Sequence, residues 1–119
     1  MKLLDVEDDP SIRHCMETLL THLGHRALGL CCDTQIDVSE VFEHVKFLNF
    51  DAALVGFVMP ATLGTDLAVR IRRLAPSIKI IIATEPVPQV IADALRRRGL
   101  DFGQLPAPFR HEELLRELT

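Results

Sequence analysis

The chain has 119 residues, of which 48% are hydrophobic and 25% are charged, a composition typical of a globular domain with one core. No stretch reaches the ~20 apolar residues of a membrane span, and the N-terminus lacks a secretory signal pattern. The formal net charge of −4 argues against direct nucleic-acid binding, which needs a basic surface. We therefore expect a cytoplasmic protein that contacts neither membrane nor nucleic acid.

Apolar runs and helical patterns alternate along the chain, starting with "KLLDV" as a buried strand. In chain order the predicted elements are strand 2–6, helix 11–24, strand 26–32, helix 35–47, strand 51–56, helix 64–74, strand 78–84, helix 88–98, strand 101–106 and helix 110–118. Asp9 and Pro10 are typical of a helix start, and Gly24 of a helix end. The unbroken isoleucine run at 80–82 suits a strand covered on both faces.

Helical spacing indicates which side chains point toward the core. The inward sets are Ile12, Cys15, Met16, Leu19, Leu20 and Leu23; Ile36, Val38, Val41, Phe42 and Val45; Leu67, Ile71 and Leu74; and Leu114, Leu115 and Leu118. The three cysteines, an odd number, suggest no disulfide framework and are expected to be buried or half-buried. The arginines at 70–73 and 96–98 are interpreted as solvated helix ends.

Five alternating strand–helix units predict an α/β fold with a parallel sheet. With right-handed crossovers this is a flavodoxin-like (βα)5 three-layer sandwich of strand order 2-1-3-4-5. A site is expected at the carboxyl ends of the strands. The residues predicted there are Glu7, Asp8 and Asp9, then Gly56, Thr84 and Ala107.

Four segments in this order resemble two-component response-regulator receiver domains, the CheY-like family. They are "LLDVEDDPSIR", "FDAALVGFVMP" followed by a glycine, "IIIAT" and "PAPFRHEELL", and together they span essentially the whole chain. The resemblance implies a single receiver-like domain over residues 1–119, the N-terminal part of a larger signalling protein. In that family a strand-end aspartate accepts a phosphoryl group, with Mg²⁺ on an acidic pair, a lysine on the phosphoryl oxygens and a hydroxyl that switches position.

Carried over residue by residue, Glu7 and Asp8 match the acidic pair and Thr84 matches the switch hydroxyl. Gly56 stands at the position of the phosphoacceptor aspartate, and Ala107 stands at the position of the lysine. Glycine offers no nucleophile and alanine no counter-charge, so the resemblance implies a degenerate receiver without catalytic residues. For Glu7 and Asp8 two readings stay open, a weak Mg²⁺ site or solvated loop carboxylates; no other cofactor is expected.

The leading functional hypothesis is a non-phosphorylatable pseudo-receiver, not an enzyme, that acts as a protein-interaction or dimerisation module. By analogy with the family it uses residues of about 88–118 and controls an attached output domain for cyclic-di-GMP turnover or DNA binding. Phe102, Leu105 and Phe109 are candidate apolar anchors, and core packing explains them equally well. One alternative is regulation through another group, such as Thr62 or Thr65. Another is a small-ligand-binding flavodoxin-like domain, although no Gly-rich phosphate loop follows the first strand.

Overall fold

In a computed structural model that describes residues 1–119, five strands and five helices alternate as the sequence predicts. The strands are β1 (Lys2–Val6), β2 (Arg26–Leu30), β3 (Ala52–Gly56), β4 (Lys79–Thr84) and β5 (Gly103–Pro106). The helices are α1 (Pro10–His22), α2 (Gln35–Phe47), α3 (Gly64–Leu74), α4 (Gln89–Arg97) and α5 (His111–Leu118). None of these helices is long and apolar enough to cross a bilayer.

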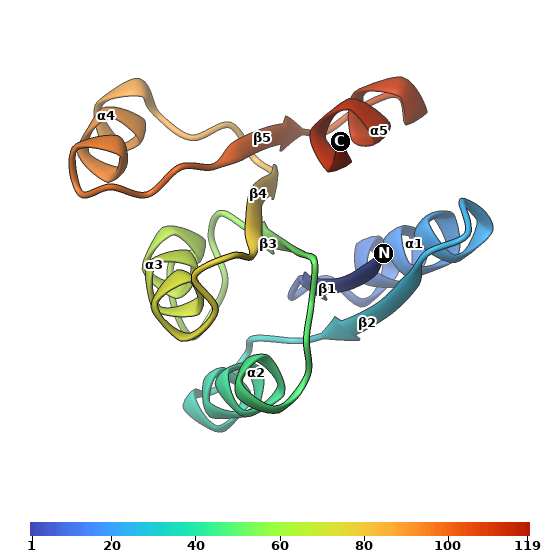
Figure 1. Cartoon of the computed structure of the whole chain (residues 1–119), viewed down its shortest axis with the longest axis horizontal. Helices are drawn as coiled ribbons and strands as arrows, with labels where there is room; N and C mark the ends of the chain where they lie inside the picture. Colours follow the sequence, from blue (N-terminus) through green and yellow to red (C-terminus); the bar gives the residue numbers. More distant parts are fainter.

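The strands form one parallel sheet of order β2-β1-β3-β4-β5. Val6 lies opposite Val55, and Gly56 lies opposite Ala83, so the carboxyl ends of β1, β3 and β4 meet at one edge. Helices α1 and α5 cover one face of the sheet, and α2, α3 and α4 cover the other (Figure 1). The flavodoxin-like three-layer fold is confirmed.

Hydrophobic burial on both faces explains the unbroken apolar strands. On β4, Ile80 and Ile82 belong to the core under α2, α3 and α4, whereas Ile81 belongs to the core under α1 and α5. All three are fully buried. The strand therefore has no solvent face, as the isoleucine run predicts.

Local signals set the helix ends where the sequence places them. The Asp9 carboxylate accepts hydrogen bonds from the N–H groups of Ser11 and Ile12 at 2.8 and 3.2 Å, which caps α1. Gly24 and Gly99 follow α1 and α4 with φ of +91° and +85°, a left-handed conformation that glycine adopts without strain.

Several side chains expected to point inward are exposed instead. Ile12, Cys15, Ile36, Leu74 and Leu115 lie on the surface, Ile36 with 73% of its area accessible. Each lies beside the row of side chains that contacts the sheet, or in the first or last turn of its helix. In these helices fewer apolar residues are buried than the helical spacing predicts. Cys31 is half-buried and Cys32 is buried, as expected.

Candidate functional site

Of the three acidic residues that follow β1, one caps a helix and two lie at the candidate site. Asp9 is used as the α1 cap, which leaves Glu7 and Asp8 at the sheet edge. Glu7 is only 5% exposed. Its carboxylate accepts the N–H of Asp9 at 3.2 Å, and its carbonyl accepts a hydrogen bond from the Arg13 guanidinium at 2.7 Å.

The Glu7 side chain turns toward the end of β3. A Cβ atom built at Gly56 would lie 3.1 Å from Glu7 Oε2 and 3.7 Å from Met59 Cγ. The carboxyl group of Glu7 thus occupies the space beside Gly56 into which a longer residue there would project. The structure therefore places these two predicted site residues beside each other.

Two buried carboxyl groups share this end of the molecule. Burial, together with a side-chain hydrogen bond to Asp8, raises the pKa of Glu7 to about 7, against the hydrogen bond from the Asp9 N–H, which lowers it. Burial also raises the pKa of Asp5 to about 8, with added repulsion from Glu7 and Glu17. Asp5 is 4% exposed and its Oδ2 has no hydrogen-bond partner.

Asp5 was not among the residues that sequence reasoning selected. It pairs in register with Gly29 on β2, where the missing side chain leaves room for Glu17 and Arg13 of α1. A signal was present, because Asp5 is the one charged residue within the apolar run Leu3–Val6. A buried acid with an unpaired oxygen is costly, which marks this position as unusual.

The loop after β3 is packed tightly against the site. The N–H of Gly64 donates to the Phe57 carbonyl at 2.6 Å, which closes the segment between β3 and α3. A Cβ at Gly64 would collide with the Gly56 carbonyl, so the start of α3 rests directly on the backbone of Gly56. The glycine at position 64 is therefore required by close packing.

Thr84 and Ala107 are hydrogen-bonded to each other through the backbone, and neither forms a hydrogen bond with Glu7 or Asp8. The N–H of Ala107 donates to the Thr84 carbonyl at 3.0 Å. Thr84 has φ of +74°, unusual for a β-branched residue, and its hydroxyl donates to the Ala83 carbonyl at 2.6 Å. With Ile12, Met16 and other α1 side chains they line an apolar groove of about 290 Å³. No cationic side chain lines it.

A second group of residues that could bind a metal lies on the loop between β2 and α2 and in the first turn of α2. One ligand atom from each of Cys31, Asp33 and Asp37 falls within 4.8 Å of the others. The Asp37 carboxylate, however, already accepts the N–H groups of Asp33 and Thr34, both at 3.0 Å, in the capping box of α2. The cluster is explained by helix capping.

Comparison with known proteins identifies the family. The model of the response regulator receiver domain matches residues 3–119, and the chain belongs to this family. It is 30% identical over 113 residues to the DNA-binding transcriptional regulator NtrC of Azospirillum brasilense, covering 95% of this chain and 22% of that protein. It is 33% identical over 84 residues to the two-component response regulator PhoP of Pseudomonas aeruginosa, covering 71% of this chain and 35% of that protein. The chain spans roughly a fifth to a third of the length of these relatives.

Solved structures confirm the fold. A CheY-like receiver domain protein of Methanospirillum hungatei superposes with a TM-score of 0.82 at 22% identity, covering 98% of this chain and 89% of that one. The receiver domain of a sensor histidine kinase of Pseudomonas aeruginosa gives a TM-score of 0.75 at 25% identity, with 98% and 93% coverage. That structure holds a magnesium ion coordinated in its active site cleft. The chain is thus a receiver domain of two-component signalling.

Proposed function

We propose that this receiver domain accepts no phosphoryl group and acts as a phosphorylation-independent docking module. The observation that carries the proposal is the position of the Glu7 carboxyl group in the space beside Gly56. A glycine at the end of β3 has no nucleophile, and the neighbouring space is filled by a carboxyl group whose pKa is raised to about 7. A carboxyl group whose pKa is raised by burial is less often ionised near neutral pH than an exposed one, which weakens it as a nucleophile and as a cation ligand.

The surrounding residues support the same conclusion. Ala107 contributes no positive charge to stabilise a transferring phosphoryl group, which is the main catalytic requirement of such a transfer. The Thr84 hydroxyl is bonded to its own strand through the Ala83 carbonyl. Glu7 and Asp8 supply two carboxylates, since Asp9 caps α1, so we expect Mg²⁺ to bind weakly at most.

The surface we propose for docking or dimerisation is formed by residues of about 88–118, where β5 is an edge strand of the sheet and α4 and α5 lie on either side of it (Figure 1). Two of the apolar anchors predicted from sequence, Phe102 and Leu105, are buried in the core and are unavailable. The large apolar side chains of α4 and α5 that are exposed are Val90, 72% accessible, and Leu115, 41% accessible. In our proposal these two residues replace Phe102 and Leu105, and the half-buried Phe109 stays an anchor as predicted.

An output domain attached to this chain is part of the proposal, because the match covers only 22% and 35% of the two relatives. One of them is named a DNA-binding transcriptional regulator, which favours DNA binding over cyclic-di-GMP turnover as the output. We expect the receiver domain itself to contact no nucleic acid, to catalyse no reaction and to work in the cytoplasm.

Regulation through another group is a weaker candidate. Thr65 is 5% exposed, so its hydroxyl is inaccessible to a kinase, and that part of the sequence-based alternative is wrong. Thr62 is half-buried and donates to the Leu63 carbonyl at 3.2 Å. No observation favours its modification.

The test is incubation with Mg²⁺ and acetyl phosphate, followed by intact mass spectrometry. We expect no phosphoryl adduct on the natural chain. The matched control is a triple variant, E7D with G56D and A107K, which shortens the obstructing side chain and restores an acceptor and a cation. We expect that variant to gain a phosphoryl group. An adduct on the natural chain that disappears in Glu7→Gln would show that Glu7 is itself an acceptor and would refute the proposal.

A further inference from the structure

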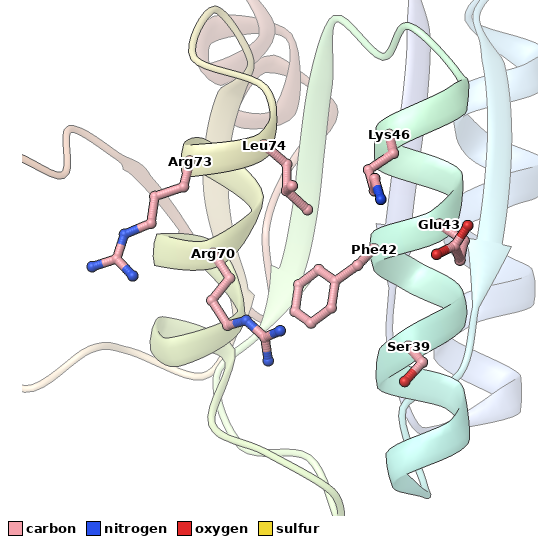
Figure 2. A pocket seen from close by; sticks show the side chains of 7 residues that line it. All are labelled: Ser39, Phe42, Glu43, Lys46, Arg70, Arg73 and Leu74. Carbon is pink, nitrogen blue, oxygen red and sulfur yellow. The ribbon is translucent and has the colours of Figure 1, made fainter.

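A cleft of about 420 Å³ lies between the second halves of α2 and α3, distinct from the edge that holds Glu7 and Gly56. Phe42 lies between the two helices, with Lys46 and Arg70 reaching toward the same gap (Figure 2). Arg73 lines the cleft further out, where its side chain extends away from Phe42 (Figure 2). The volume falls within the range of sites that hold small ligands.

Arg70 is held in place without being neutralised. Its guanidinium carbon lies 4.0 Å from the centre of the Phe42 ring, a stacking contact that orients the planar group. The Arg70 side chain is exposed, and its guanidinium forms neither a hydrogen bond nor an ion pair within the chain. Its N–H donors are therefore oriented and free.

The charge around the cleft is unbalanced. Lys46, Arg70 and Arg73 line it, and Glu43 is the one carboxylate that does so. In Figure 2 the Glu43 carboxylate points to the outer side of α2, away from Arg70. Complementing the helix dipoles explains Lys46 and Arg73, which lie in last turns. It does not explain Arg70, so the interpretation of this arginine as a solvated helix end is incomplete.

We propose that the α2–α3 cleft binds the phosphate group of a small phosphorylated molecule. Arg70 offers the paired donors that suit phosphate oxygens, and Lys46 and Arg73 add charge. A compact anion fits better than an acidic protein segment, because the three cationic side chains line one concave site and the chain as a whole has a net charge of −4. The shared chemistry is the phosphate, whether it comes from an inorganic anion or from a nucleotide whose base covers the open face of Arg70.

The test is an amide NMR titration of the natural chain with inorganic pyrophosphate, with adenosine monophosphate and with an oligoglutamate peptide, at constant ionic strength. We expect saturable shifts at residues 39–46 and 70–74 with the phosphate compounds. Tighter binding of the nucleotide would show that its base contributes, and equal affinity would show recognition of phosphate alone. Arg70→Gln and Lys46→Gln should each weaken binding by about tenfold, whereas Arg97→Gln, an exposed arginine at the end of α4, should leave it unchanged.

Three results would overturn the proposal. The first is the absence of saturation with both phosphate compounds. The second is an equal loss of affinity in Arg97→Gln, which would show diffuse charge attraction. The third is tighter binding of the peptide than of either phosphate compound, which would assign the cleft to an acidic protein segment.

Discussion

Replacing Asp5 with valine should change the pH dependence of stability more than any surface substitution. Asp5 is buried without a partner for Oδ2, and its pKa is raised from 3.8 to about 8. The unfolded chain therefore releases this proton near pH 4, while the folded chain retains it until about pH 8. Raising the pH through this window favours unfolding, so the natural chain loses stability as the pH rises.

The magnitude follows from the size of the shift. Each pH unit inside the window costs up to ~1.4 kcal/mol, and the span from pH 5 to pH 7 costs about 2–3 kcal/mol from Asp5 alone. Asp5→Val removes the titrating group and adds a β-branched side chain suited to a strand. The stability advantage of the variant should therefore grow by about 2–3 kcal/mol between those two pH values.

The assay is urea unfolding followed by far-ultraviolet circular dichroism at several pH values, because the chain contains neither Trp nor Tyr for fluorescence. Asp101→Asn, at an exposed carboxylate, is the matched control and should follow the natural chain. If Asp5→Val and the natural chain give parallel stability curves, Asp5 does not hold its proton in the folded state and the burial reasoning is refuted.

Three further substitutions test the geometry around the site by chemical denaturation. Asp9→Ala should cost about 1 kcal/mol through loss of the α1 cap, and an unchanged midpoint would contradict that role. Thr84→Gly should stabilise the chain by about 1 kcal/mol, because the residue has φ of +74°; a loss of stability would show that the side chain outweighs backbone strain. Gly64→Ala should destabilise by at least ~2 kcal/mol, because its Cβ would collide with the Gly56 carbonyl, and a neutral result would argue against that packing.

The fold was predictable because its signals are local. Apolar runs mark the strands, the Asp9–Pro10 pair and Gly24 mark the ends of α1, and the alternation of elements leads to a parallel sheet. Exposure was less predictable, as Ile36 and Leu115 show. Their spacing fits a buried stripe, but which helix surface meets the sheet depends on tertiary packing.

The candidate site was predictable in its residues and not in its contacts. Strand ends identify Glu7, Gly56, Thr84 and Ala107, because parallel strands place their carboxyl ends along one edge. The Glu7 side chain reaches into the space beside Gly56 only because of the conformation it adopts in the folded chain. The two residues lie at the ends of strands that are far apart in the sequence, so no local pattern predicts this conformation. The α2–α3 cleft likewise depends on the contact between Arg70 of α3 and Phe42 of α2. No local sequence pattern predicts a contact between two helices.

The central claim is that the edge around Glu7 and Gly56 no longer responds to phosphoryl chemistry. The most direct measurement is an amide NMR titration of the natural chain with Mg²⁺ and then with beryllium fluoride, which mimics a phosphoryl group. We predict a Mg²⁺ dissociation constant above the micromolar range. We also predict that beryllium fluoride causes no shifts of the amide signals of Glu7, Asp8, Thr84 or α4. Concerted shifts at those residues would contradict the account, since they would show that the site still binds the mimic and transmits its presence to the docking face.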